Sequence, residues 1–363
     1  NESDWEEKLS IKRINVGVIG TGWCGGIRAN TCATSALVDE LHIAEINPER
    51  LEEVAKETGA KTATADLKEL LANGDIDTFI ISATPEITHY PMALECLKAG
   101  KHVFLEKPIS LTLKEADELV DLARDNSLKF TIGYSQRFNP KFAYVKKSLN
   151  DGTLGDPVSA LVSRHISRNL GDKIGGRIKL SPAAMEATHD LDFVLWCLEP
   201  AKPIRVYAQA VNKVMRPTHD VEDCMWIVVT MDDGTVLTVG AGWIMPPAYP
   251  NFSTTTIEFV GSKGALMIDD SHKDVMLTTM DGGIVHPMST MPGEQVEHVF
   301  AGPMHNETLH FLEAVSYDRP VMVTPEQARM VMEVYMAADL SAERNEPVSL
   351  PMNTQDISEA APV

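Results

Sequence analysis

The 363-residue sequence predicts an α/β fold, with a parallel sheet in an N-terminal domain and a large open, mainly antiparallel sheet in a C-terminal α+β domain. From residue 14 to about residue 150, short apolar runs alternate with amphipathic stretches, which is typical of a parallel sheet covered by helices on both faces. After residue 152, several strands follow one another with turn signals between them. At roughly 150 residues per domain, the length also favours two domains.

The elements of the N-terminal half follow from local patterns. The expected strands are short, β-branched and apolar, and they cover residues 14–20, 41–45, 78–82, 102–105 and 129–134. The helices between them cover residues 25–36, 48–58, 87–99 and 113–124. Pro48 stands where a proline opens a helix, and Gly100 stands where a glycine ends one.

The C-terminal half is richer in strands. They are expected at residues 158–162, 205–212, 224–231, 235–241, 254–260 and 265–268. Leucines and a valine at helical spacing predict a helix over residues 184–198, and two further helices are expected at 305–317 and 325–341. We therefore expect one domain over residues 1–136, with a tail at 1–12, a second domain over 137–350, and a C-terminal tail at 351–363.

The composition excludes several classes of function. The chain has 32 Lys and Arg against 52 Asp and Glu, a net charge of −20, whereas nucleic-acid-binding domains are usually basic. No apolar run approaches the roughly 20 residues that span a bilayer, and the first residues lack the pattern of a signal peptide. The five cysteines form no CxxC pair, so neither a disulfide scaffold nor a metal site is expected. A cytoplasmic location is the expectation.

A glycine-rich turn directly follows the first expected strand and opens the first helix. It reads Gly20-Thr21-Gly22-Trp23-Cys24-Gly25. Its glycines allow a tight turn, a close approach of the backbone to a pyrophosphate, and close packing of helix on strand. Free N–H groups and the helix dipole favour phosphate there. We therefore expect this turn to bind a dinucleotide through Gly20, Gly22, Trp23, Cys24 and Gly25; the alternative is a glycine turn without a ligand.

Glu45 ends the second expected strand, 20 residues after Gly25. This is the spacing of the carboxylate that holds a ribose 2′-hydroxyl, and a carboxylate repels the 2′-phosphate of NADP. The next residue is Ile46, which brings no basic group. NAD is therefore favoured over NADP.

Lys107 follows the strand at residues 102–105, within Glu106-Lys107-Pro108. Ligands of open parallel sheets bind at the carboxyl ends of the strands, so Lys107 lies at the correct end of its strand to reach a substrate. A lysine there can stabilise a developing alkoxide. The alternative is an exposed surface lysine.

Several motifs in this order resemble the glucose–fructose oxidoreductase / inositol dehydrogenase (Gfo/Idh/MocA) family. They are the glycine turn, the run from Ala44 to Arg50, Ala83-Thr84-Pro85 with His89, Glu106-Lys107-Pro108, Arg137-Phe138-Asn139-Pro140 and His189-Asp190-Leu191-Asp192. The resemblance covers about residues 14–350. It implies a Rossmann domain, a second domain whose open sheet forms an oligomer interface, and NAD(P)-dependent redox chemistry on sugars, cyclitols or related alcohols. A homodimer or homotetramer is expected.

The resemblance also implies roles for single residues. Lys107 matches the catalytic lysine, His189 matches the proposed proton acceptor, and Asp192 matches a supporting position. Many members have an Asp four residues before the histidine, where this sequence has Met185. Glu186 lies one helical turn before His189 and can share its face, so we expect Glu186 to replace that Asp. The alternatives are that His189 works with Lys107 alone, or that another group accepts the proton.

Weaker candidates surround these residues. By resemblance, Thr84 and Pro85 contact the nicotinamide half of the cofactor. His89, Glu106 and Arg137 are further cofactor-binding candidates, although His89 could cap a helix and Arg137 could pack between domains. A basic cluster could meet substrate hydroxyls or an anionic group, or could be a solvated loop. Its members are Arg164, His165, Arg168 and Lys173, of which Arg164 and His165 join Lys107, Met185 and His189 as the expected substrate-binding residues.

These observations predict an NAD-dependent dehydrogenase of a sugar, sugar derivative or cyclitol. In this reaction His189 accepts the hydroxyl proton and Lys107 holds the oxygen. Two alternatives stay open. One is a keto-sugar reductase or a dehydrogenase of a non-sugar diol that uses the same site. The other is a non-catalytic NAD-binding regulator built on this fold.

Overall fold

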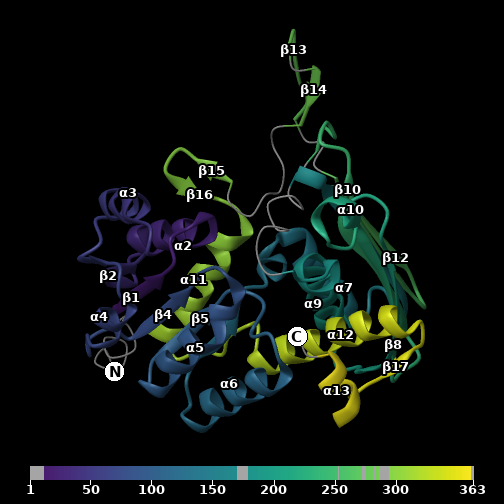
Figure 1. Ribbon diagram of the computed structural model, residues 1–363, viewed down its shortest axis with the longest axis horizontal. Helices are drawn as coiled ribbons and strands as arrows, with labels where there is room; N and C mark the ends of the chain where they lie inside the picture. Colours follow the sequence, from purple (N-terminus) through teal and green to yellow (C-terminus); the bar gives the residue numbers. More distant parts are fainter. Residues whose placement is uncertain are drawn as a thin grey trace, which may run out of the picture. The chain divides into compact units, whose positions relative to one another are not determined.

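The computed structural model describes residues 12–169, 179–251, 253–271, 275–281, 283–286 and 294–360. The elements divide into two compact units, and the first of them begins with β1 (Ile14–Ile19) (Figure 1). The division falls between Ser135 and Gln136, next to the expected boundary at residue 136. None of the helices in the described part of the chain combines the length and the apolar character that crossing a bilayer requires.

The first unit contains a parallel six-stranded sheet in the order β3-β2-β1-β4-β5-β6. This is the doubly wound order of dinucleotide-binding domains. Strands β2 and β3 are added on one side of β1, and β4, β5 and β6 are added on the other side. The strands are nearly fully buried, as expected for a sheet covered on both faces. The other strands are β2 (Val38–Ala44), β3 (Thr62–Thr64), β4 (Thr78–Ile81), β5 (His102–Leu105) and β6 (Phe130–Ile132).

The helices of the first unit confirm most of the expected positions. They are α2 (Trp23–Thr34), α3 (Pro48–Thr58), α4 (Leu67–Leu71), α5 (His89–Lys98) and α6 (Leu113–Asp125), with a short helix η1 (Glu86–Thr88) before α5. The strand β3 and the helix α4 were not expected. Asn47 begins α3, because its side chain accepts hydrogen bonds from the amides of Glu49 and Arg50 at 3.0 and 3.1 Å.

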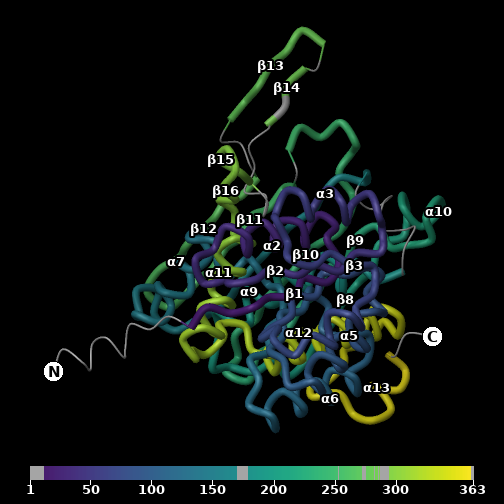
Figure 2. Tube along the Cα trace, turned by 90° about the vertical axis from the view of Figure 1, so that its left-hand side faces the viewer, coloured from purple at the N-terminus to yellow at the C-terminus, as the bar shows by residue number. Residues whose placement is uncertain are grey.

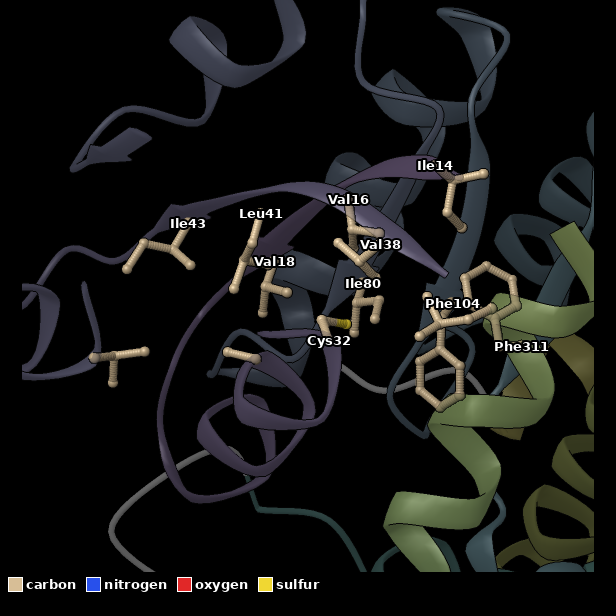
Figure 3. Close-up of a cluster of buried hydrophobic side chains, with 13 residues drawn as sticks. Ile14, Val16, Val18, Cys32, Val38, Leu41, Ile43, Ile80, Phe104 and Phe311 are labelled. Atoms are coloured by element: carbon tan, nitrogen blue, oxygen red, sulfur yellow. The ribbon is translucent and has the colours of Figure 1, made fainter. Parts of the chain in front are cut away.

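A helix from much later in the chain belongs to this unit. Helix α11 (Pro303–Ser316) packs on α2 and β1, and Figure 2 shows these elements close together. Its Phe311 and Leu312 are buried in the core cluster of the sheet, where the Phe311 ring lies 5.6 Å from that of Phe104 (Figure 3). Helix α11 thus lies within the sequence range expected for the second domain, 137–350, but belongs to the first compact unit, because its apolar face completes the first core. The short strands β15 (Gln295–Val296) and β16 (Val299–Phe300) precede it.

The second unit is built on a mixed, mainly antiparallel seven-stranded sheet in the order β12-β11-β7-β10-β9-β8-β17. Only β7 and β10 pair in parallel. The strands are β7 (Pro157–Ser167), β8 (Pro203–Val211), β9 (Cys224–Met231), β10 (Val236–Met245), β11 (Thr255–Gly261), β12 (Ala265–Asp270) and β17 (Val348–Ser349). A separate hairpin of β13 (Leu277–Thr279) and β14 (Gly283–Val285) extends away from this sheet in both views (Figures 1 and 2).

The helices of the second unit include one irregular turn. Residues Ala183–Ala187 form a π-helical turn, η3, which continues into α9 (Thr188–Leu198), where the sequence predicted one regular helix. The π-helical turn and α9 pack on β10, and α9 also packs on β7 and α7. The other helices are α7 (Pro140–Asn150), the single turn α10 (Arg216–His219), α12 (Pro325–Arg344) and α13 (Thr354–Ala360), while η2 (Ser135–Phe138) lies at the division between the units.

The expected C-terminal tail is wrong for the described residues up to 360. Helix α13 (Thr354–Ala360) lies within the expected tail. Asn353, just before this helix, accepts a hydrogen bond from the amide of Asp356 at 3.0 Å. Arg344 donates to the buried carboxylate of Asp356 at 2.7 Å. These polar contacts hold the segment against α12. The expected N-terminal tail at 1–12 lies outside the described residues except for Lys12.

Candidate active site

The glycine turn has the geometry that a close ligand requires. Gly20 has a φ of +78°, and a Cβ there would lie 2.7 Å from the backbone of Ala83. A Cβ on Gly25 would lie 1.8 Å from the carbonyl oxygen of Gly20, so only glycine fits this contact of helix and strand. Around Gly22 no atom lies within 4 Å of a Cβ position, and the neighbouring Trp23 is exposed. The turn therefore presents open backbone at the start of α2, which fits a pyrophosphate.

Glu45 lies at the carboxyl end of β2 and is tied to the glycine turn. Its carboxylate accepts hydrogen bonds from the amide of Thr21 at 2.7 Å, from the Thr21 hydroxyl at 3.1 Å, and from the amide of Asn47 at 3.0 Å. Partial burial alone would raise the pKa of this carboxyl, but the amides of Asn47 and Thr21 outweigh burial and hold the pKa below its usual value. Glu45 is thus a fixed anion beside the turn.

The segments after β4 and β5 are joined by His89. Its Nδ1 lies 2.8 Å from the carbonyl oxygen of Pro108, and its Nε2 lies 3.0 Å from that of Ala83. The ring is buried. These contacts assign His89 to holding the two segments rather than to a direct contact with a cofactor. Thr84 and Pro85 are exposed, and Lys107, directly after β5, is partly exposed.

Glu106 belongs to a buried ionic cluster around Arg28 of α2, which sequence reasoning missed. Arg28 donates from Nε to the Glu106 carboxylate at 2.8 Å and from Nη2 to Glu307 of α11 at 2.8 Å. Nη1 donates to the Thr308 hydroxyl at 2.9 Å, and the guanidinium carbon lies 3.9 Å from the centre of the Phe104 ring. The sequence did contain one signal for this cluster, because Arg28 is a charged residue on the buried face of its helix. Glu106 therefore acts within the protein framework beside Lys107.

Cys24 is not poised for redox chemistry. Burial, followed by the charge of Glu106, raises the pKa of its thiol to about 12, so the reactive thiolate is scarce at neutral pH. Within the described ranges, no group of three or more His, Cys, Asp and Glu side chains is arranged to hold a metal ion.

In the second unit, Arg164 of β7 binds the π-helical turn and the first turn of α9. Its Nη1 donates to the Glu186 carboxylate at 3.0 Å and its Nε donates to Asp190 at 2.8 Å. Nη2 donates to the backbone carbonyl of Glu186. The other oxygen of Glu186 accepts from Trp243 Nε1 at 3.1 Å, and Gln136 donates to Asp190 at 3.3 Å. We call these five residues the Arg164 cluster.

This cluster changes the interpretation of Glu186. Both of its carboxylate oxygens have donors, and Glu186 lies with Asp190, four residues later, around one guanidinium. The expectation that Glu186 acts with His189 assumed a regular α-helix, and the π-helical turn removes that premise. We therefore assign Glu186 to supporting the turn. His189 is partly exposed, whereas both flanking carboxylates are buried.

The remaining expected substrate residues lie in different surroundings. Arg164 is neutralised by two carboxylates and is not a separate anion-binding group. His165, its neighbour on β7, points to the opposite face of the sheet because side chains alternate along a strand, and its ring lies 5.5 Å from that of Trp226. Met185 is buried in an apolar cluster with Trp243. Lys173 lies outside the described residues.

Arg137 is also part of the framework of the second unit. It is buried, and it donates to the buried carboxylate of Asp192 at 2.8 Å and to Gln327 at 2.8 Å. Burial raises the pKa of Asp192, and the charge of Arg137 opposes this shift. Asn139 begins α7 by accepting from the amide of Lys141 at 3.0 Å. These contacts make Arg137 part of the buried framework within the second unit.

Known proteins resemble this chain over nearly its whole length. A myo-inositol 2-dehydrogenase of Thermotoga maritima is 24% identical over 93% of this chain and 98% of its own length. The scyllo-inositol 2-dehydrogenase (NAD(+)) of Bacillus subtilis is 25% identical over 93% and 96%. A crystal structure of scyllo-inositol dehydrogenase from Lactobacillus casei, with bound NAD(H) and scyllo-inositol, has a TM-score of 0.80 at 23% identity and covers 93% of this chain and 99% of its own.

Two family models cover both units. One, described as an oxidoreductase family with an NAD-binding Rossmann fold, matches residues 14–134. The other, described as the C-terminal alpha/beta domain of an oxidoreductase family, matches residues 146–350. Together with the strand order of the first sheet and the open glycine turn, these matches show that the chain is an NAD-binding oxidoreductase of the Gfo/Idh/MocA family.

Proposed function

We propose that this protein is an NAD-dependent dehydrogenase that oxidises a secondary alcohol of a cyclitol, sugar or sugar derivative. The observation that carries the choice of NAD is the Glu45 carboxylate, which is fixed at the end of β2 by the amides of Thr21 and Asn47. A fixed anion there suits a ribose 2′-hydroxyl and repels a 2′-phosphate. The inositol-specific names of the relatives support the substrate class.

In this proposal two residues act on the alcohol. NAD, when bound, supplies the hydride acceptor. The His189 imidazole accepts the hydroxyl proton, which is the role that general-base histidines usually fill. The Lys107 side chain donates to the same oxygen and stabilises the negative charge that develops on it. Contacts of neighbouring residues support this proposal: Glu106, which precedes Lys107, belongs to the Arg28 cluster, and Glu186 and Asp190 of the Arg164 cluster flank His189 in the sequence.

A spectrophotometric screen tests the proposal. NADH formation is followed with NAD and with NADP, separately, against inositols, sugars, glycosides and sugar acids. We expect turnover with NAD on at least one cyclic polyol. Keto-sugars with NADH test the reverse direction. Activity restricted to simple aliphatic alcohols or 2-hydroxy acids would contradict the substrate class, and cofactor binding without turnover on the whole panel would favour a non-catalytic regulator.

The choice of cofactor has its own test. In Glu45→Gln the side chain keeps its size but loses the charge that repels a 2′-phosphate. We expect the ratio of kcat/KM for NAD over NADP to fall by about 10-fold or more, because removing one charge contact is worth about 1.4 kcal/mol or more. Glu49→Gln, an exposed neutralisation in the first turn of α3, is the matched control and should leave the ratio unchanged. An unaltered ratio in Glu45→Gln would refute this role.

We also propose that the open face of the seven-stranded sheet joins two copies of this chain. Exposed apolar side chains lie on this face of neighbouring strands. Leu161 and Val228 both pair with Thr238 of the strand between them, and Val228 pairs with Tyr207. Leu161, Val228 and Tyr207 are all exposed, and a group of exposed apolar side chains favours an interaction surface.

Sedimentation of a double variant tests the interface. We expect Leu161→Lys with Val228→Lys to convert the oligomer into a smaller species with an unchanged circular dichroism spectrum. Val299→Lys, which changes an exposed apolar residue of the first unit, is the control and should leave the oligomer intact. A wild-type monomer would contradict the proposal.

A further inference from the structure

We infer that Arg164 is a positioning residue for His189, acting through the π-helical turn at Ala183–Ala187. The inference rests on the proposed function only for the consequence on turnover. The arrangement itself is a property of the second unit alone, because Arg164, Glu186, Asp190 and His189 all belong to it.

The π-helical turn requires stabilising contacts from the surrounding structure. A π-helical turn inserts an extra residue into a helix, so that every later side chain is rotated about the helix axis relative to a regular α-helix. Such turns are rare and persist where surrounding contacts hold them. All five residues from Ala183 to Ala187 are buried, and His189 follows two residues after the turn ends. The direction of the His189 side chain therefore depends on the turn.

Arg164 holds the turn from both sides of His189. It binds the carboxylate and the backbone carbonyl of Glu186, three residues before His189, and the carboxylate of Asp190, one residue after it. The planar guanidinium has donors in a fixed fork, so bonds to both residues determine the rotation of the segment between them. Trp243, which is fully buried, fixes the remaining oxygen of Glu186.

The charges of the cluster make Arg164 unsuited to its expected role as an anchor for an anionic substrate. One guanidinium faces two buried carboxylates, so the cluster of charged groups carries one net negative charge when both carboxylates are ionised. Gln136 and Trp243 contribute donors without charge.

Two substitutions separate the geometry from the charge. Arg164→Lys keeps the charge but loses the fork, so we expect kcat to fall by about 10- to 100-fold while KM for NAD and the pH profile stay close to those of the wild type. Arg164→Met loses both the fork and the charge and leaves two carboxylates uncompensated, so kcat should fall at least as far as in Arg164→Lys. Arg344→Lys, at another Arg–Asp pair of the second unit, is the control and should keep the wild-type kcat.

A readout without turnover keeps this inference separate from the proposed function. The His189 ring signal is recorded by NMR with labelled histidine and is assigned by its loss in His189→Gln. If the enzyme proves inactive on every substrate, a displaced His189 signal in Arg164→Lys, which keeps the wild-type charge, still supports the positioning role. Should Arg164→Lys fail to fold, Trp243→Phe removes one donor to Glu186 and should displace the same signal. An unchanged His189 signal together with an unchanged kcat in the folded variants would overturn the inference.

Discussion

The two units each bury an arginine between two carboxylates, but they assemble these clusters differently. In the first unit Arg28 joins segments far apart in the chain, since Glu106 follows β5 and Glu307 belongs to α11. In the second unit the two carboxylates around Arg164 lie four residues apart on one helical segment. Each cluster includes a direct neighbour of a proposed catalytic residue: Glu106 precedes Lys107, and Asp190 follows His189.

The difference indicates what each cluster stabilises. The Arg28 cluster connects α2, which starts at the glycine turn, to the segment of Lys107 and to α11, so its loss should affect the stability of the whole first unit. The Arg164 cluster fixes the rotation of one helix, so its loss should affect activity in addition to stability. Removing one partner of a buried ion pair typically costs about 3–5 kcal/mol because a charge is left uncompensated.

The largest expected effect tests whether both units contribute to catalysis. Lys107→Ala and His189→Ala should each lower kcat/KM by about 100- to 10,000-fold, because each removes a group that acts on the developing oxygen charge or its proton. Steady-state kinetics with the substrate from the screen measures this. Lys98→Ala, an exposed lysine at the end of α5, is the control and should behave as wild type. If only one variant lost activity, the catalytic residues would belong to one unit.

The next effect separates the two clusters by stability. Arg28→Met should lower the free energy of unfolding of the first unit by about 3–5 kcal/mol, since Glu106 and Glu307 then keep buried charges without their guanidinium. Urea denaturation measures it. Adding Glu307→Leu to Arg28→Met removes one stranded charge and should recover part of the loss. Arg164→Met is the matched variant, and only the loss in Arg28→Met should extend to the whole first unit; an equal loss of activity in both variants would remove the distinction drawn between the clusters.

Asp339 of α12 should make the stability of the protein depend on pH. It differs in this from the carboxylates of the two arginine clusters, which are paired with a guanidinium. Burial raises the pKa of Asp339 to about 7 from 3.8, and its Oδ1 has no hydrogen-bond partner among the residues that the structure describes. The folded state keeps this proton up to about pH 7, whereas the unfolded state loses it near pH 4, so stability falls as the pH rises between these values.

Asp339→Asn removes this dependence because it cannot ionise. We expect a gain in unfolding free energy of about 1–2 kcal/mol at pH 8 and almost none at pH 4. Thermal denaturation at both pH values measures the gain. Asp356→Asn is the contrasting variant: Asp356 is paired with Arg344, so its neutralisation should destabilise the protein at pH 8. A gain of the same size at pH 4 and pH 8 would contradict the assignment to ionisation.

The smallest expected effect is a loss of stability that should be equal in the two units. An asparagine followed by a proline begins α3 in the first unit and α7 in the second. Asn47→Ala and Asn139→Ala should each cost about 1 kcal/mol, because each removes a side chain that accepts from amides of the first helical turn. Denaturant titrations measure both. A much larger cost for one would show that its asparagine does more than cap a helix.

Local patterns were sufficient to predict most strands of the two large sheets, the glycine turn and the position of Glu45 after the second strand. These features depend on residues close together in the chain, and the doubly wound sheet follows from their alternation. The Arg28 cluster could not be predicted, because it depends on contacts between α2 and α11. The π-helical turn depends on Arg164 and Trp243, which come from other strands. The expected strand ended at residue 162, whereas β7 continues to Ser167. With the longer strand, the alternation of side chains would have predicted that Arg164 and His165 point to opposite faces of the sheet.

The place of α11 in the first unit has a consequence for synthesis on the ribosome. The unit reaches the end of β6 at Ile132, but its core lacks Phe311 until α11 has been made. At about 5–20 residues per second, adding residues 136–302 takes roughly 8–33 s. During that interval the nascent first unit exposes the surface that Phe311 will cover, and Arg28 lacks its partner Glu307. Full stability of the nucleotide-binding unit is therefore reached only after most of the second unit has been translated, but before α12 has been made.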